Sequence, residues 1–151
     1  MSRTEVSRWK ALIAAGVLAS ALATAPAATQ ETDATQIRRV VTSAYIEGLH
    51  KNGSREAIRQ GFHPDFVMKV LDGNEIVNVT IEEWIGRLPE EGTPVDHEVT
   101  HEVPTVSISG KAATAMVEVM FDGEHVFTDY MSLYEFEEGW RIVAKIFNRE
   151  G

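Results

Sequence analysis

The sequence predicts one α+β domain, with helices packed on a curved, mostly antiparallel sheet, behind an N-terminal export signal. Apolar residues recur at helical spacing between residues 37 and 61, whereas they alternate with period two between residues 95 and 148. Helices that come first and strands that come last are typical of α+β folds rather than of doubly wound parallel sheets. Long strands joined by tight turns at the end of the chain predict an antiparallel meander.

Residues 1–27 have the pattern of a cleavable secretory signal peptide. Arg3, Arg8 and Lys10 form a positive start, and residues 11–25 form an uncharged apolar run that leads to the small-residue site Ala25-Pro26-Ala27. The run has 15 residues, whereas a membrane-spanning helix needs about 20. We therefore predict cleavage and a periplasmic or secreted protein. The alternative is an uncleaved N-terminal anchor.

The mature chain is strongly acidic. The formal charge of −9 becomes −11 once the leader, with three basic residues and one acid, is removed. Such a charge repels phosphate backbones and anionic lipids, so we expect no nucleic-acid partner and no membrane partner after signal cleavage. The chain has no cysteine, which excludes disulfides, a thiolate nucleophile and cysteine-bound metals.

The helical part of the domain follows a short polar stretch. Residues 28–35 predict a flexible lead-in, and the domain itself spans residues 36–151. An apolar stripe predicts a first helix from Ile37 to Leu49, which Lys51-Asn52-Gly53 ends. Ser54 can then cap a shorter second helix that runs to about Gly61.

A hairpin and a third helix follow. Asp72-Gly73-Asn74 is a hairpin turn between strands at Phe66–Leu71 and Glu75–Val79. Thr80 to Glu83 matches a capping box, which begins a helix from Ile81 to about Leu88. Four strands complete the chain, over residues 95–109, 112–121, 125–136 and 140–148.

This order of elements resembles the nuclear-transport-factor-two-like superfamily, of SnoaL-like form, in which helices close a cone over a bent sheet. Segments similar to the branch named "putative lumazine-binding" are AYIEGL (44–49), FHPD (62–65), DYMSL (129–133) and GWRIVAKIF (139–147). The resemblance covers residues 36–148. It implies a cone-shaped fold with three N-terminal helices, and a homodimer. It does not imply an activity, because this superfamily includes isomerases, dehydratases and transport factors.

The segment His97-Glu98-Val99-Thr100-His101 has the H-E-x-x-H order of zinc proteases. That chemistry needs a helix, on which two histidines four residues apart bind one metal. Pro94, Pro104 and the β-branched residues between them predict a strand instead. A strand separates the two histidines by about 13 Å, so we predict no metal site.

Turn geometry assigns the last three strands to two faces. A three-residue turn at Glu137–Gly139 would place Phe136 opposite Trp140. A mixed polar and apolar face then carries Met116, Glu118, Asp129, Met131, Leu133, Val143, Lys145 and Phe147. A nearly continuous apolar face carries Val117, Val119, Phe121, Tyr130, Tyr134, Trp140, Ile142 and Ile146.

Two arrangements of this sheet are open. In the first, which packing favours, the helices cover the apolar face, and the mixed face meets solvent or a dimer partner. In the second, a cavity lies over the mixed face, and Asp129 and Lys145 are its polar groups. If exposed, this pair would be a cross-strand ion pair worth under about 1 kcal/mol.

The candidate catalytic residues are Tyr45, His63 and Asp129. Tyr45, on the buried stripe of the first helix, resembles in approximate position the tyrosine that polarises a carbonyl in ketosteroid isomerase. His63 precedes Pro64 at a helix–strand junction, where it can act as an acid or base or bond to the backbone. The candidate ligand-binding residues are Tyr45, Phe62, His63, Trp84, Asp129, Tyr130 and Lys145.

We therefore expect an exported domain that binds a small apolar or aromatic ligand, without a cofactor, in an apolar pocket of about 300 Å³ or more. One alternative is a cofactor-free enzyme of isomerase or dehydratase type, which requires the candidate catalytic residues to converge on one substrate. The other is a protein-interaction module that uses the apolar sheet face.

Overall fold

The computed structural model describes residues 31–151, and the predicted signal peptide lies outside the described residues. The first helix, α1 (Asp33–Val40), begins earlier than expected, because the Thr32 hydroxyl accepts a hydrogen bond from the Thr35 N–H and caps it. The lead-in predicted for residues 28–35 is therefore helical from Asp33 onward.

Helix α1 continues directly as η1 (Val41–His50), a π-helix in which backbone hydrogen bonds join residues five apart. The Lys51 N–H donates to the Ile46 carbonyl at 2.9 Å, which extends this pattern to the end of the helix. Asn52, whose φ is 52°, then turns the chain, and its side chain donates to the carbonyls of Glu90 and Thr93. The predicted first helix is thus one long helical segment, which is α-helical in its first part and π-helical in its second.

The two shorter helices begin as predicted. The Ser54 hydroxyl caps α2 (Arg55–Gly61), and Thr80 forms a capping box with Glu83 at the start of α3 (Ile81–Gly86). Helix α2 packs closely on η1. This is possible because Gly61 has no Cβ, which would overlap the Cβ of Ala44.

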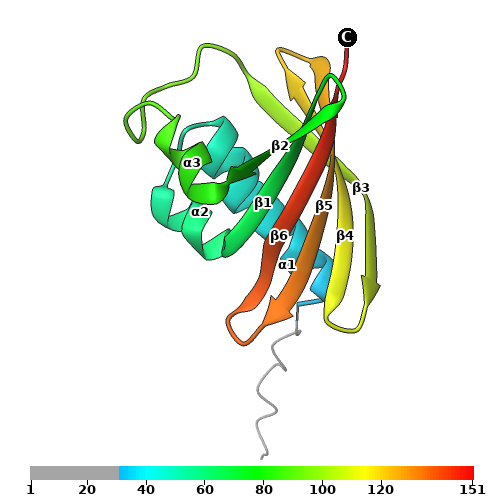
Figure 1. Cartoon of the computed structure of the whole chain (residues 1–151). Coiled ribbons are helices and arrows are strands. Elements are labelled where there is room, and N and C mark those ends of the chain that lie inside the picture. Colours follow the sequence, from blue (N-terminus) through cyan, green and yellow to red (C-terminus); the bar gives the residue numbers. More distant parts are fainter. Residues whose placement is uncertain (1–30) are drawn as a thin grey trace, which may run out of the picture. The chain divides into compact units, whose positions relative to one another are not determined.

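Six strands form one bent sheet in the order β2-β1-β6-β5-β4-β3. Their bounds are Phe62–Asp72 (β1), Glu75–Thr80 (β2), Val99–Ser109 (β3), Ala112–Phe121 (β4), Glu124–Phe136 (β5) and Gly139–Arg149 (β6). Strands β1 and β6 pair in parallel, and all other pairs are antiparallel. Figure 1 shows the helices gathered on one side of this sheet. The predicted α+β class with a curved, mostly antiparallel sheet is confirmed.

The helices cover the face that carries Asp129, Met131 and Lys145, which is the arrangement that the packing argument did not favour. Met116 and Glu118, which were grouped with these residues, lie on the outer face instead, where they pair with Tyr130 and Thr128. Asp129, Met131 and Lys145 are buried beneath the helices, whereas Tyr130 and Ile146 project from the other side and are about half exposed. Val117, Val119, Trp140 and Ile142 are also buried in the core. The prediction that grouped these four with Tyr130 was wrong.

Two β-bulges explain the error. Met120 pairs with His125 but Val119 pairs with Phe127, so β5 contains one extra residue at this point. Strand β6 contains another, because Ser132 pairs with Ala144 and Leu133 with Ile142. An extra residue moves every side chain beyond it to the opposite face. The four apolar residues that were grouped with Tyr130 therefore lie on the face of Asp129, in the core.

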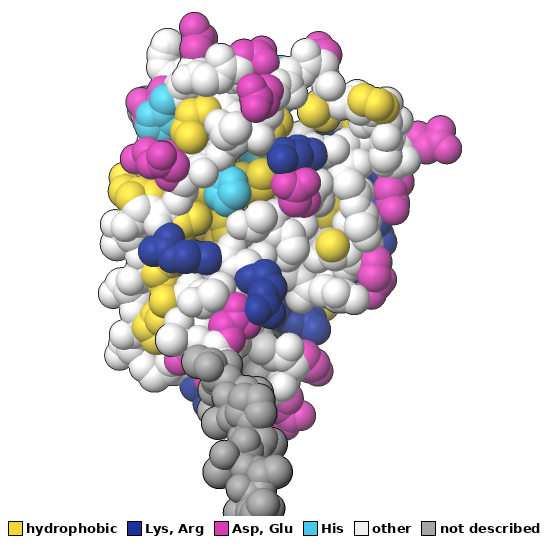
Figure 2. Space-filling model, turned by 180° about the vertical axis from the view of Figure 1, so that it is seen from behind, with side chains coloured by type: hydrophobic (Ala, Val, Ile, Leu, Met, Phe, Trp, Pro, Cys, Tyr) yellow, Lys and Arg dark blue, Asp and Glu magenta, His cyan; other side chains and the backbone are white. Residues whose placement is uncertain are grey.

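The helix side of the surface is of mixed charge. Figure 2 shows acidic and basic side chains interspersed on this face, without a continuous basic area on it. Within residues 31–151, no helix has the length and apolarity needed to span a membrane.

Candidate functional site

A buried polar cluster lies between the long helix and the sheet. Tyr45 comes from η1, Asp129 from β5 and Lys145 from β6, and their exposed fractions are 0%, 0% and 4%. The Tyr45 hydroxyl donates to Asp129 Oδ2 at 2.6 Å, and Lys145 Nζ donates to the Tyr45 oxygen at 2.9 Å. Lys145 also forms an ion pair with Asp129 Oδ1. The three groups close a ring of hydrogen bonds.

Burial dominates the electrostatics of this cluster. Removal from water raises the pKa of Tyr45 well above its ordinary value, and the Asp129 charge raises it further. Removal from water also lowers the pKa of Lys145, although Asp129 opposes this effect. The tyrosine therefore stays protonated and donates to Asp129. The lysine depends on Asp129 to keep its charge.

Three aromatic rings surround the ammonium of Lys145. Its Nζ lies 4.4 Å from the ring centre of Phe147, 4.9 Å from that of Tyr45 and 5.4 Å from that of Trp84. Aromatic faces attract cations at such distances. Two of the three ammonium N–H bonds go to Tyr45 and Asp129, and the third has no acceptor among residues 31–151.

An interior cavity of about 130 Å³ adjoins this ammonium. Its lining residues are Tyr45, His50, Met68, Trp84, Phe127, Lys145 and Phe147. Tyr45, Met68 and Lys145 are buried, whereas the other four are partly exposed and lie toward its mouth. Apart from the cluster, the polar groups in this lining are the His50 imidazole and the indole N–H of Trp84.

His50 is a site residue that the sequence analysis missed. It ends η1, and its ring contacts that of Tyr45 edge to face, with the ring centres 4.6 Å apart. Its Nε2 is buried and has no hydrogen-bond partner among the described residues. Burial, followed by the charges of Lys145 and His97, lowers the pKa of His50 from 6.5 to about 3. The imidazole is therefore neutral at physiological pH.

The remaining candidates divide between the cavity region and other places. Trp84 lines the cavity, and Phe62 lies behind it in the core, with the two ring centres 6.4 Å apart. His63 stacks on Phe136 with ring centres 4.8 Å apart, and its Nδ1 accepts the Asp65 N–H at 3.1 Å. The convergence of His63 with Tyr45 and Asp129 that the isomerase or dehydratase alternative requires does not occur. His63 instead makes the backbone hydrogen bond of the alternative interpretation.

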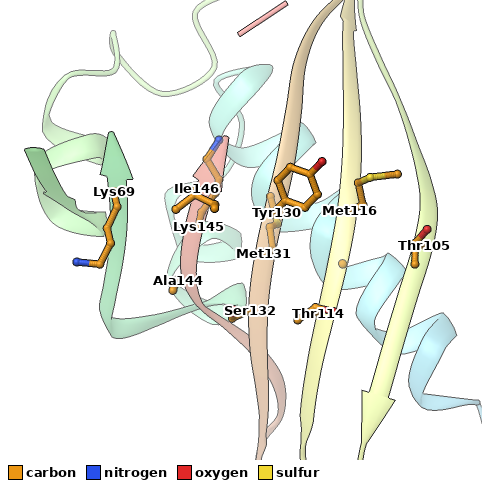
Figure 3. A pocket seen from close by; sticks show the side chains of 11 residues that line it. Lys69, Thr105, Thr114, Met116, Tyr130, Met131, Ser132, Ala144, Lys145 and Ile146 are labelled. Carbon is orange, nitrogen blue, oxygen red and sulfur yellow. The ribbon is translucent and has the colours of Figure 1, made fainter. Parts of the chain in front are cut away.

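Tyr130 belongs to a second hollow, on the outer face of the sheet. This hollow has a volume of about 430 Å³. In Figure 3, Tyr130, Met116 and Ile146 project from neighbouring strands at this face. Lys69 also lies at its edge. Tyr130 is therefore separated by the sheet from the cavity that adjoins Lys145.

The H-E-x-x-H segment is not helical, as predicted. His97 precedes β3 and packs on Phe121 with ring centres 4.2 Å apart, whereas His101 lies in β3 and its Nε2 bonds to Thr42 at 3.0 Å. Among residues 31–151, no group of three or more His, Asp or Glu side chains has the geometry to hold a metal ion.

Residues 31–148, which include the whole cluster and the cavity, match the model of the family described as "Putative lumazine-binding". The chain belongs to this family. Solved structures titled NTF2-like share its fold, which is the fold that the sequence resemblance implies.

One similar protein is named "Aldolase FrzH", from Cladobotryum sp. It is 27% identical over 110 residues, which are 69% of this chain and 82% of that protein. Among solved structures, an NTF2-like protein of unknown function from Shewanella baltica has a TM-score of 0.64 and 23% identity, over 77% of this chain and 92% of that one. One titled a putative ketosteroid isomerase, from Shewanella frigidimarina, has a TM-score of 0.53 and 14% identity, over 77% and 97%. These structures show a shared fold.

Proposed function

We propose that the chain binds a small molecule in the interior cavity, with an oxygen of the ligand accepting a hydrogen bond from Lys145. One observation carries this proposal. A buried ammonium adjoins a mostly apolar cavity and has one N–H without an acceptor in the described part of the chain. An apolar pocket with a few placed polar groups is the usual form of a small-molecule site.

A purely structural role explains the cluster poorly. Two buried charges lose their hydration, and an apolar trio of similar volume often stabilises a fold as well or better. The Tyr45 hydroxyl and the Asp129 carboxylate hold the ammonium in place from two sides. Such fixed positioning suits recognition of a ligand oxygen more than it suits stability.

The volume of the cavity limits the ligand. A cavity of about 130 Å³ is slightly smaller than the engineered cavity of about 150 Å³ that binds benzene, and smaller than the pocket of about 300 Å³ expected from the sequence. We therefore propose a ligand of one six-membered ring or less. A ligand with two fused rings, such as lumazine, would extend through the mouth of the cavity.

Binding of phenol and of toluene tests the proposal, because the two molecules have similar size and differ only in a hydroxyl group in place of a methyl group. We expect phenol to bind about 10- to 100-fold more tightly, since a hydrogen bond to a charged donor contributes about 1.5–3 kcal/mol. In the double variant Lys145→Met/Asp129→Asn, which leaves no unpaired buried charge, this preference should disappear. Lys69→Met, on the outer face, is the matched control. Equal affinity for phenol and toluene in the unaltered protein would contradict the proposal.

A second candidate function is a cofactor-free reaction at the carbon beside a carbonyl group. The relative named an aldolase favours it, and so does the Lys145 N–H, which can stabilise the negative charge that develops on a carbonyl oxygen. His50, with a pKa of about 3, is a weak base at neutral pH. Exchange of the α-hydrogens of cyclohexanone in D₂O, followed by NMR, tests this candidate. Exchange that persists in Lys145→Met/Asp129→Asn would reject Lys145 as the stabilising group.

We also propose that the outer sheet face forms a homodimer interface in the exported protein. Tyr130, Tyr134 and Ile146 support this, because about half of each side chain is exposed there. Exposed apolar patches of this kind mark interaction surfaces.

Fractionation of cells that express the full chain tests the proposed export.

A further inference from the structure

We propose that His50 is a second ligand-binding residue, and that the ligand is a single-ring compound with two polar substituents, one for Lys145 and one for His50 Nε2. This inference rests on the proposed function and specifies its ligand. His50 lines the same cavity as Lys145, and its Nε2 is buried and has no hydrogen-bond partner among residues 31–151. Buried polar atoms without partners are rare in folded proteins, so this one requires an explanation.

The positions of the two polar groups fit one small molecule. Both contact the Tyr45 ring, whose centre lies 4.9 Å from Lys145 Nζ and 4.6 Å from the centre of the His50 ring. These two distances limit the separation of Lys145 Nζ from the centre of the His50 ring to less than about 10 Å, which a benzene-sized ring with two hydrogen-bonded substituents can span. Phe127 and Phe147, with ring centres 5.7 Å apart, provide apolar surface for its faces.

The π-helical turn creates this arrangement. At about 3.6 residues per turn, an α-helix would place residues five apart about 140° from each other around the axis. The wider π-turn instead brings the Tyr45 and His50 rings into contact. Because π-helical turns occur often at functional sites, the geometry of η1 is independent support for a role of His50.

The neutral imidazole decides which substituent fits. A neutral histidine carries one ring hydrogen, so Nε2 is either a donor or an acceptor, depending on the tautomer. A hydroxyl group can pair with either form. Dihydroxybenzenes therefore have the required pattern, and each cresol is the matching molecule in which one hydroxyl is replaced by a methyl group of similar size.

His97 provides a matched control on the same side of the molecule. Its Nε2 is also buried without a partner among the described residues, but its ring packs on Phe121, and His97 does not line the interior cavity. The substitutions His50→Phe and His97→Phe thus make the same chemical change inside and outside the cavity. His97→Phe also removes a charge that lowers the pKa of His50, so an affinity change common to both variants is not assigned to a ligand contact. His50→Gln keeps a hydrogen-bonding end group and tests rescue.

Calorimetry with 1,2-, 1,3- and 1,4-dihydroxybenzene and the corresponding cresols tests the inference on the full chain and its variants. We expect at least one dihydroxybenzene to bind about tenfold more tightly than its cresol, because it pairs both polar groups. His50→Phe should abolish this preference, His50→Gln should restore part of it, and His97→Phe should leave it unchanged.

Two other results would overturn the inference. If no dihydroxybenzene exceeds its cresol, or if the preference survives His50→Phe, His50 does not bind the ligand. In both cases the preference for phenol over toluene, which depends on Lys145, is retained, and the proposed function stands. Loss of that preference in the unaltered protein is instead a failure of the proposed function, and the assignment of His50 fails with it. If His50→Phe does not fold, His50→Gln is compared with His97→Phe instead. A smaller preference for the dihydroxybenzene in His50→Gln supports the inference, and equal preferences overturn it.

Discussion

Replacement of Asp129 by asparagine should strongly destabilise the protein. The substitution keeps the shape of the side chain and its acceptor oxygen, but it leaves the Lys145 ammonium buried without a countercharge. Removal of one partner of a buried ion pair typically costs about 3–5 kcal/mol. Deprotonation of Lys145 sets a similar upper limit on this loss of stability. The lysine can lose its proton instead, which at pH 7 costs about 5 kcal/mol for a group whose ordinary pKa is 10.5.

The same reasoning predicts that an apolar replacement of the whole cluster restores stability. The triple variant Tyr45→Phe/Asp129→Leu/Lys145→Met buries no charge and leaves no hydroxyl without a partner, so its stability should equal or exceed that of the unaltered protein. Urea unfolding measures both effects. A loss of about 4 kcal/mol moves the midpoint by about 2 M if the slope is about 2 kcal/mol per M.

The pH dependence of Asp129→Asn identifies the cause. When folded Lys145 is neutral, the unfolded chain binds more protons below pH 10.5, so the stability of this variant should rise as the pH rises from 7 toward 10. An Asp129→Asn protein within 1 kcal/mol of the unaltered protein would refute the reasoning, as would a triple variant no more stable than the single one.

Three further predictions concern other parts of the fold. Because the pKa of folded His50 is about 3 and its ordinary value is 6.5, the unfolded chain takes up the extra proton as the pH falls between these values. The free energy of unfolding should therefore fall by about 2 kcal/mol by pH 5. In urea titrations His50→Gln should lack this loss, and an unchanged loss would place the acid sensitivity elsewhere. Gly61→Ala should cost about 1–3 kcal/mol in thermal unfolding, because its Cβ would overlap that of Ala44. Gly86→Ala, with open space around its Cβ, should be neutral or slightly stabilising, and equal effects at both glycines would contradict this account. Ile146→Asp should shift sedimentation toward monomer, and a mass unchanged from a dimer would exclude this face as the interface.

Much of the fold could be predicted because its local signals are strong. The Ser54 cap, the Thr80 capping box and the turns between strands lie where the sequence placed them. The assignment of sheet faces failed because a β-bulge has no clear local signature. Met131 nevertheless pairs with Lys145, and Asp129 with Phe147, as predicted. The turn after β5 is one residue shorter than assumed, because Phe136 pairs with Gly139. The extra residue of the bulge in β6 restores the predicted register from Ser132 to Asp129.

The site was predicted in part. Tyr45, Asp129 and Lys145 were named as candidates, and the structure brings them together in one cluster. His50 was missed because the expected helix had α-helical spacing, which turns it away from Tyr45. A single sequence gives no clear sign of a π-helix. Tyr130 was assigned to the ligand because the pattern did not decide which face of the sheet the helices cover. As the neighbour of Asp129 in β5, it lies on the opposite, outer face.

The position of a bound probe tests the central claim most directly. We predict that a crystal structure of the protein grown with phenol has the phenol ring in the interior cavity, with its oxygen within hydrogen-bond distance of Lys145 Nζ. Phenol bound only in the hollow beside Tyr130, with the interior cavity collapsed around Trp84, would contradict the claim.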